Sequence, residues 1–428
     1  MYSLLKAIRT VKHVDTSKNR LKVFEDIASK HTLIRMAYLA FQNTAHTPIG
    51  TLLLLVYGLK CFMTIKLPVK KSTELLCFAS YPNEHIAINR IKTEFSGVDI
   101  NDLLISKKYI FSITNWIAAL SYILLIPHLY SFARNCSNNL HFMPACRVFS
   151  TVAFYFRFKN ILGQLNIKGI LVANHYSPEC TALMAAAKNM SIKVIFTNHA
   201  HTPEQVTFPS SPPVDLALLT SGAVYHKLIS KSKQHIRYKL IGYEQNKKPL
   251  QLDFSSNSKL TVGIFFTALT NMDRVRILID RFLNAFHPKK ILLRPHPVTL
   301  LKENFSGIQQ DYSVVKISKN TSLNYDINQC DLIVCGNTGA VIEILKGGCP
   351  VLYDAELDQI TYDYNGFIEG GLIPSADKIN NQLLTKLSKF YKREGWEKIM
   401  QLYDASYLND KNVLLKEAEI DLKRVLTQ

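Results

Sequence analysis

Two short polar stretches in the second half of the chain carry residue types that could bind an anion. Residues 294–297 read Arg-Pro-His-Pro, and residues 336–339 read Gly-Asn-Thr-Gly. The prolines restrict the backbone, so a guanidinium and an imidazole would be held in fixed positions. The second stretch precedes a helical pattern, and the first N–H groups of a helix bind phosphate well. We therefore expect a nucleotide to bind where the two stretches meet.

Four short apolar runs around these stretches predict a parallel sheet. They occupy residues 291–293, 314–317, 332–335 and 351–353 and are separated by helical or loop lengths. Both polar stretches follow such a run directly, so they would lie at the carboxyl edge of the sheet, where open α/β sheets bind ligands.

Two further features of this half could contribute to the same site. After the apolar run 259–266, Thr267 and Asn271 could either contact the ligand or cap the helix that begins near Asp273. In the helix after residue 339, the apolar residues share one face, which leaves Glu343 toward the cleft or solvent. Glu343 is thus either an ordinary surface residue or a contact to the ribose of a nucleotide.

The first half contains one clear β-α-β unit. Residues 167–173 and 192–197 predict parallel strands, and Ser177 with Pro178 is a typical helix start between them. Polar residues follow the strands, and a base that accepts a proton from a substrate hydroxyl could come from this set. Alternatively, these residues are structural, and Glu179 only complements the helix dipole. The candidate bases are His175, Glu179 and His199, and His201 could line the acceptor side.

Together these pieces resemble GT-B glycosyltransferases of bacterial surface polysaccharide synthesis, most closely sialyltransferases, polysialyltransferases and capsule Kdo transferases. The resemblance covers roughly residues 167–205 and 255–380. It implies two Rossmann-like α/β domains that face each other across a cleft. It also implies metal-independent, inverting transfer of an acidic sugar from a CMP-sugar donor to a bacterial surface glycan or lipid-linked acceptor. Alternatives are a UDP- or GDP-sugar transferase, a CDP-glycerol glycerophosphotransferase, a sugar epimerase and a non-catalytic nucleotide-sugar-binding protein.

The resemblance assigns the donor phosphate to the His-Pro turn and to the polar turn that follows it. The residues that we expect to bind the donor are Arg294, His296, Pro297, Asn337, Thr338, Gly339, Glu343, Thr267 and Asn271. No cofactor is expected apart from the donor itself. The sialyltransferase group has an acidic-acidic-Gly tripeptide that supplies its base, and this sequence has none. His175, Glu179 and His199 therefore remain the candidate bases.

The length of 428 residues favours two domains. We expect an acceptor-side domain over residues 1–245 with a helical N-terminal part, a nucleotide-sugar-binding domain over 255–380, and C-terminal helices over 381–428. The polar stretch 245–258 would be the linker. The first 150 residues match no part of the resemblance.

Charge and cysteine usage limit the partners and the compartment. The formal net charge is +18, which suits an anionic donor, an anionic glycan or an acidic membrane surface. No nucleic-acid motif occurs, so we expect no nucleic acid. The eight cysteines are scattered without a CxxC pair, which predicts reduced, buried thiols, no metal site and a cytoplasmic protein.

Two apolar segments bear on membrane attachment. Residues 48–59 are too few to cross a bilayer and predict a core element. Residues 109–130 contain no Asp, Glu, Lys or Arg. A buried helix is the first interpretation of the longer segment, an interfacial helix at the anionic inner membrane the second, and a spanning helix the last.

Overall fold

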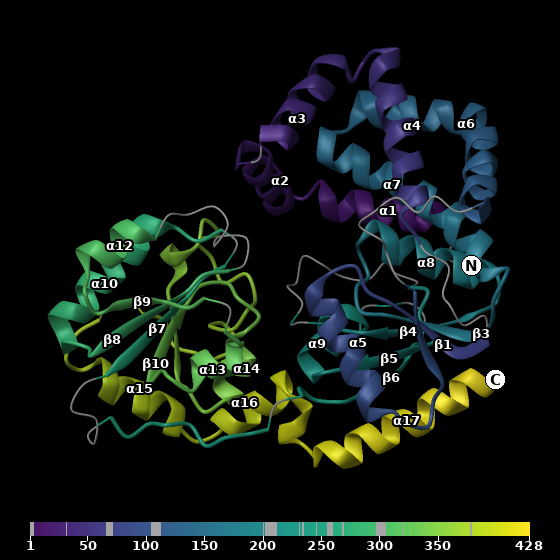
Figure 1. Ribbon diagram of the computed structural model, residues 1–428. Helices are drawn as coiled ribbons and strands as arrows, with labels where there is room; N and C mark the ends of the chain where they lie inside the picture. The colour runs from purple at the N-terminus through teal and green to yellow at the C-terminus, as the bar shows by residue number, and fades with distance from the viewer. Residues whose placement is uncertain are drawn as a thin grey trace.

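The computed structural model contains two parallel β-sheets, each flanked by helices (Figure 1). It describes residues 4–30, 32–65, 72–103, 113–199, 201, 212–230, 232, 235–244, 246–254, 260–267, 269–296, 305–319, 321–376 and 379–428. The predicted residue Pro297 lies outside these ranges, as do residues 109–112 of the longer apolar segment.

The first sheet has six parallel strands in the order β2-β1-β3-β4-β5-β6. The strands predicted at residues 167–173 and 192–197 are confirmed as β3 and β4, whereas β1, β2 and β6 were not predicted. The strands are β1 (Ser72–Phe78), β2 (Ile100–Leu103), β3 (Asn166–Val172), β4 (Lys193–Thr197), β5 (Leu216–Leu219) and β6 (Arg237–Leu240).

The second sheet has five parallel strands in the order β11-β10-β7-β8-β9. All four apolar runs around the polar stretches are strands, as predicted. The strands are β7 (Thr261–Phe265), β8 (Lys290–Arg294), β9 (Val315–Ile317), β10 (Leu332–Cys335) and β11 (Val351–Tyr353). Because every pairing in both sheets is parallel, the carboxyl ends of the strands within a sheet meet at a single edge.

Helices cover both sheets, as crossover connections between parallel strands require. In the first half they are α1 (Leu4–Asp15), α2 (Lys18–Lys30), α3 (Thr32–Thr44), α4 (Pro48–Met63), α5 (Pro82–Glu94), α6 (Ile113–Asn139), α7 (Phe142–Leu162), α8 (Pro178–Asn189) and α9 (Gly222–Leu228). In the second half they are α10 (Met272–Phe286), α12 (Ser306–Asp311), α13 (Leu323–Ile327), α14 (Val341–Lys346), α15 (Leu383–Lys392), α16 (Trp396–Tyr403) and α17 (Lys411–Thr427), with short 3₁₀ turns at Ala355–Leu357 and Ala405–Tyr407.

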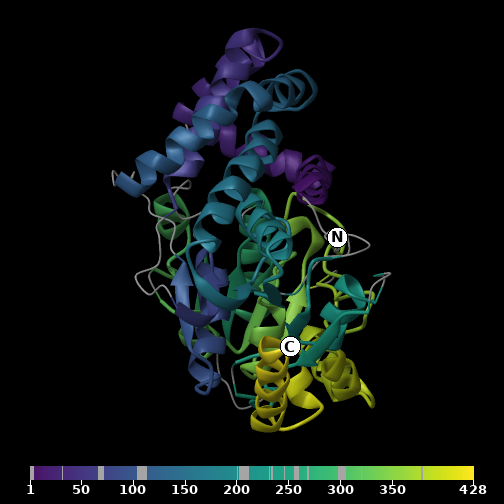
Figure 2. The same ribbon diagram turned by 90° about the vertical axis from the view of Figure 1, so that its right-hand side faces the viewer.

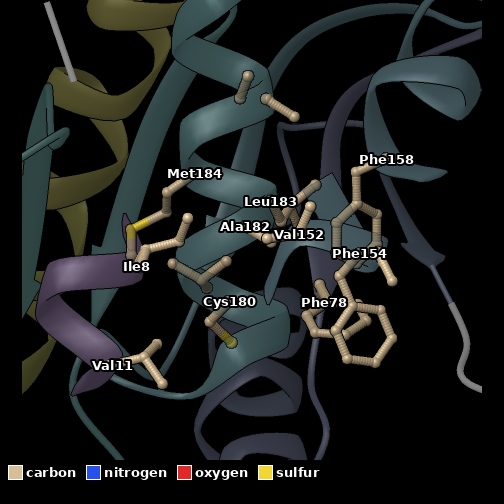
Figure 3. Packing of buried hydrophobic residues seen from close by; sticks show 14 of the residues in the cluster. Ile8, Val11, Phe78, Val152, Phe154, Phe158, Cys180, Ala182, Leu183 and Met184 are labelled. Atoms are coloured by element: carbon tan, nitrogen blue, oxygen red, sulfur yellow. The ribbon is translucent and has the colours of Figure 1, made fainter. Parts of the chain in front are cut away.

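The N-terminal helices are built onto the first sheet through α8. Its small side chains, among them Ala182, Ala185 and Ala186, are fully buried, so neighbouring helices can approach closely. Figure 3 shows Ile8 of α1 packing on one side of α8, and Phe158 of α7 on the other. The 150 residues that the resemblance left unplaced thus form a helical layer with two strands of the sheet.

Each sheet has its own hydrophobic core, so the chain has the expected α/β class with two Rossmann-like domains (Figures 1 and 2). The C-terminal helices divide between the two cores. Helices α15 and α16 pack in the second core through Leu387 and Trp396. Helix α17 returns to the first sheet and buries Leu415 and Leu422 there.

A buried ionic network joins the two domains where the chain crosses between them. The ammonium of Lys346, at the end of α14, lies 2.8 Å from the carboxylate of Asp404. It also donates to the carbonyl of Tyr243 at 2.9 Å and to the hydroxyl of Ser406 at 2.7 Å. Because Lys346 and Asp404 are almost fully buried, their pairing offsets a large desolvation cost and restricts how the domains move.

The structure corrects the first interpretation of the longer apolar segment. Helix α6 buries Ala119, Tyr122 and Leu129, but Leu120 and Leu124 point to solvent. The segment is therefore apolar on an exposed side as well as on a buried side. None of the helices within the described ranges is long and apolar enough to cross a membrane. The eight cysteines are all buried and unpaired, as predicted.

Candidate functional site

At the carboxyl edge of the second sheet, Arg294 is engaged by the protein itself. Its Nη1 forms an ion pair with the buried carboxylate of Asp326 and donates to the carbonyl of Thr321 at 3.2 Å. Asp326 also accepts from the hydroxyl of Ser318 at 2.5 Å. The side chain of Arg294 keeps 24% of its surface exposed, so part of the guanidinium still faces solvent.

The turn that was expected to hold a phosphate holds a carboxylate of this chain. Asp358 is 2% exposed and accepts hydrogen bonds from the main-chain N–H of Asn337 and the hydroxyl of Thr267. Gly336 is necessary here because a Cβ would collide with this carboxylate. Burial raises the pKa of Asp358, and its two hydrogen bonds partly oppose that shift.

The side chain of Asn337 fastens the loop that follows β11. Its amide donates to the carbonyls of Ile360 and Tyr362, both at 2.9 Å. Its oxygen accepts from the hydroxyl of Tyr353 at 3.1 Å and from the N–H of Tyr364 at 2.8 Å. These four bonds use the full capacity of the amide group, so the predicted contact from this side chain to a donor would require the loop to open.

Apart from Glu343, one of the remaining residues predicted to bind the donor caps a helix, and the others lie at the carboxyl edge of the second sheet. Asn271 caps α10 by accepting from the N–H groups of Asp273 and Arg274, the structural alternative named above. His296 and Gly339 are half-buried at the edge. Thr338 accepts from the N–H of Ala340 at 3.2 Å. Helix α14 starts only at Val341 and has six residues, so its N-terminus is displaced from the predicted turn.

Glu343 lies on the linker side of α14 and not beside the turn. Burial raises the pKa of Glu343 to about 7, the nearby Glu244 adds to the shift, and Lys346 opposes it. A carboxyl so close to a second carboxylate exchanges its proton near neutral pH. The structure thus places this residue beside the buried ionic network of Lys346 and Asp404.

At the carboxyl edge of the first sheet, two asparagines form the turns. Asn174 accepts from the N–H groups of Tyr176 and Ser177 and donates to the buried carboxylate of Glu84 at 2.8 Å. Asn198 donates to the hydroxyl of Thr220 at 2.8 Å, which ties the end of β4 to the end of β5. These residues fix the backbone from which the candidate bases project.

The three histidines of this edge have different surroundings. His175 is buried, and its ring meets those of Tyr176 and Phe196 edge to face. His201 is buried against the second domain, where burial and Lys227 lower its pKa to about 3. His199 is half-buried, and its Nδ1 lies 2.6 Å from the carbonyl oxygen of Ala173.

That contact sets the tautomer of His199. A carbonyl oxygen can only accept, so Nδ1 carries the proton, and in the neutral ring Nε2 carries the lone pair. Nε2 has no hydrogen bond among the described residues. An oriented imidazole with an open Nε2 is the arrangement that a general base needs.

Glu179 belongs to a charged cluster beneath the N-terminal helices. Burial raises its pKa, and Arg147 opposes the shift. Arg147 donates from Nε to Asp15 at 2.7 Å, and Arg20 lies 3.7 Å from the same carboxylate. Within the described ranges, Oε2 of Glu179 and Nη2 of Arg147 are buried without a hydrogen-bond partner. Unpaired charged atoms in such positions are costly.

The two edges approach each other beside this cluster. Tyr364 lies close enough to Tyr176 and Arg20 that both affect its pKa, which burial raises to about 12. Lys22 on α2 donates to the carbonyl of Gln359 at 3.3 Å. The helical layer therefore reaches the loop of the second domain that Asn337 fastens.

The sequence interpretation missed several residues of this region: Asp15, Arg20, Arg147 and Asp358. A signal for Arg147 existed, since it is a lone charge in the apolar stretch 142–156. A buried position for such a residue implies a carboxylate partner, but the sequence does not reveal which one.

No protein-family model matches this sequence, and no curated protein matches it either. Solved structures do match. A UDP-N-acetylglucosamine 2-epimerase has 13% identity and a TM-score of 0.50, with 83% of this chain and 96% of that chain covered. The UDP-GlcNAc 2-epimerase of Methanocaldococcus jannaschii, in complex with UDP-GlcNAc and UDP, has 12% identity and a TM-score of 0.49, with 83% and 99% covered. A glycotransferase of kitacinnamycin has 10% identity and a TM-score of 0.49, with 83% and 100% covered.

At these identities the likeness concerns the fold alone. Two parallel α/β domains and a final helix that returns to the first domain define the GT-B class of fold. Sugar-nucleotide epimerases and glycosyltransferases are both among the structures similar to this chain. The narrower resemblance to sialyltransferases and Kdo transferases stays a prediction.

Proposed function

We propose that this protein is a glycosyltransferase that binds a nucleotide-activated sugar at the second sheet and transfers the sugar to an acceptor hydroxyl at the first. The hydrogen bond from His199 to Ala173 carries the proposal, because it orients a base with an open nitrogen at the acceptor-side edge. The proximity of Tyr364 to Tyr176 further supports a reaction between the two edges.

His199 is the best of the three predicted bases. The ring of His175 is buried between aromatic residues, where an acceptor hydroxyl has no access. Glu179 lies in the charged cluster with Arg147, and its Oε2 is buried, so an acceptor hydroxyl has less access to it than to His199. In the proposed mechanism Nε2 of His199 removes the proton of the acceptor hydroxyl as its oxygen bonds to the anomeric carbon of the donor sugar. The bond from that carbon to the phosphate oxygen breaks in the same step, and the nucleotide leaves with the bonding electron pair.

For the donor we propose a CMP-activated acidic sugar, such as sialic acid or Kdo, as the resemblance implies. The acceptor would be a bacterial surface glycan or its lipid-linked precursor, and the enzyme would work at the cytoplasmic face of the inner membrane without a metal and with inversion. His296 and Thr338 are the polar residues at the second edge best placed to meet the leaving phosphate. A phosphate at the N–H of Asn337 would first have to displace Asp358.

The base is tested with His199→Asn, which keeps a polar group but removes the basic nitrogen. We expect turnover with pooled nucleotide sugars to fall by about 10²–10⁴-fold, the usual contribution of a general base. Nucleotide affinity, measured by calorimetry, should stay unchanged. His226→Asn, on the exposed surface of α9, is the matched control. Full activity of His199→Asn would exclude this residue as the base.

The donor is tested by calorimetry with CMP, UDP, GDP and CDP. Tighter binding of CMP supports the acidic-sugar donor, whereas tighter binding of UDP or GDP favours the alternative transferases. Nucleotide binding without turnover of any pooled donor would favour a non-catalytic binding protein, and interconversion of a sugar nucleotide without an acceptor would favour an epimerase.

A further inference from the structure

Three N-terminal helices expose apolar stripes to solvent. Helix α4 packs against both α3 and α6, so the three helices are neighbours. The exposed apolar residues are Leu33, Met36 and Leu39 on α3, Ile49, Leu52, Leu53 and Val56 on α4, and Ile117, Leu120, Ile123 and Leu124 on α6. We call this set the docking face. Within each helix these residues follow one another at intervals of three or four positions, with Leu53 and Leu124 next to such a position. This spacing places them on one side of their helix.

The docking face is not the side by which these helices join the protein. Helix α4 packs inward through Leu54 and Phe62, and α6 packs inward through Tyr122 and Ala133. Leu124, in contrast, is 76% exposed. Figures 1 and 2 both place the three helices at the end of the molecule away from the two sheets. Apolar patches of this extent are uncommon on soluble monomers and mark interaction surfaces.

The charge around the docking face selects the partner. Residues 27–73 and 104–165, which include all three helices, contain no Asp or Glu. The exposed charged residues on the helices are Arg35, Lys60 and Arg134. A surface that combines apolar side chains with cations and no anions is complementary to anionic lipid, whose headgroups attract Lys and Arg.

We propose that the docking face lies in the surface of an anionic lipid bilayer, with α3, α4 and α6 parallel to the membrane and not across it. The face would bury its apolar side chains at the level of the acyl chains, while Arg35, Lys60 and Arg134 contact headgroups. This interaction depends on no substrate, so its test is independent of the proposed function.

One consequence rests on the proposed function. On its other side α4 carries Tyr57 and Cys61, and both are close enough to Glu179 for its charge to raise their pKa values further. Helix α4 also packs on α7, and α7 packs on α8, whose first turn carries Glu179. The candidate acceptor edge therefore lies on the inner side of the helical layer that carries the docking face, an arrangement that suits a lipid-linked acceptor.

The test is co-sedimentation of the full-length protein with vesicles of phosphatidylcholine, with and without phosphatidylglycerol. We expect binding to the anionic vesicles and release at high salt, because the headgroup contacts are screened. The double substitution Leu120→Glu with Leu124→Glu should weaken partitioning by about tenfold or more, since it replaces two apolar contacts by anions. The control, Ile277→Glu with Ile420→Glu, changes exposed apolar residues elsewhere and should bind as the parent does.

Tryptophan fluorescence gives a second readout in the same samples. The chain has two tryptophans: Trp116 on α6 is 51% exposed, whereas Trp396 is buried in the second domain. We expect a blue shift on addition of anionic vesicles in the parent and none in Trp116→Phe. Circular dichroism of each variant checks that it is folded.

Absence of binding by the parent would overturn the proposal, as would equal binding by the α6 double variant. A parent that dimerises in light scattering, and becomes a monomer in the α6 variant without binding vesicles, would assign the docking face to a second copy of the chain. Binding without turnover would leave the docking face intact and count only against the proposed function.

Discussion

The carboxyl edges of the two sheets differ in how completely their buried charged side chains are hydrogen-bonded. At the second edge, Asp326 and Asp358 each accept hydrogen bonds from surrounding donors, and these bonds include the N–H and the guanidinium that were expected to meet a phosphate. At the first edge, the cluster of Asp15, Arg147 and Glu179 includes buried charged atoms that lack hydrogen bonds within the described residues.

This difference teaches where each edge can respond to a ligand. Buried polar atoms are nearly always paired in folded proteins, and an unpaired one indicates a site of strain or function. At the first edge, Oε2 of Glu179 and Nη2 of Arg147 could therefore bind a polar group of a ligand without first breaking a hydrogen bond among the described residues. The second edge must first exchange its own carboxylate contacts, which couples donor binding to movement of the loop that carries Asp358. The predictions below test this contrast, from the largest expected effect to the smallest.

The first prediction removes the carboxylate from the first edge. Asp15→Asn removes the buried carboxylate that pairs with Arg147 at 2.7 Å and lies 3.7 Å from Arg20. We expect the free energy of unfolding, measured with urea, to fall by about 3–5 kcal/mol, as for other buried pairs from which one partner is removed. Asp311→Asn breaks the exposed pair with Arg276 and should cost less than about 1 kcal/mol. If both substitutions lowered the free energy of unfolding equally, the buried Asp15–Arg147 pair would matter no more for stability than an exposed ion pair.

The second prediction applies the same change to the second edge. Asp326→Asn removes the charge next to Arg294 but keeps an acceptor for Ser318 and Thr321. Arg294 can also turn to solvent. We expect a smaller loss of about 2–3 kcal/mol, the size of a hydrogen bond between charged groups. A loss larger than that of Asp15→Asn would reverse the contrast between the edges.

The third prediction uses pH to test Glu343. Because its folded pKa of about 7 is above its usual 4.5, ionisation costs the folded state stability, and the loss accumulates as the pH rises from 4.5 to 7. Glu343→Gln should therefore raise the free energy of unfolding by about 1–2 kcal/mol at pH 8 and by almost nothing at pH 4. Glu394→Gln, on an exposed position, is the control. A gain that does not depend on pH would show that the carboxyl ionises normally.

The fourth prediction tests whether Asp358 competes with a phosphate. Asp358→Asn keeps an acceptor for the N–H of Asn337 but removes the negative charge. If nucleotide phosphate binds at this turn, affinity for the nucleotide should rise by about tenfold, or 1.4 kcal/mol, in calorimetry. Unchanged affinity would place the donor phosphate elsewhere, nearer to His296.

Much of the second domain follows from local sequence. The runs 291–293, 332–335 and 351–353 are apolar, β-branched and bounded by turn residues, so their strands could be predicted. Ser177 and Asn271 cap their helices as their types suggest. The first 150 residues were harder, because β2 has only four residues, and Glu74 in β1 and Asp102 in β2 interrupt the apolar pattern of these strands.

The sequence by itself thus determined the α/β class, the positions of the central strands along the chain and the polar residues that follow them, since strands and caps depend on neighbours in the chain. Only the tertiary structure decided what those residues contact. Arg147 meets Asp15 across 132 positions, and Asp358 takes the N–H of Asn337 across 21. Such pairings depend on how distant segments pack. They are not encoded in any local pattern, because a buried charge requires a partner without specifying which residue it will be.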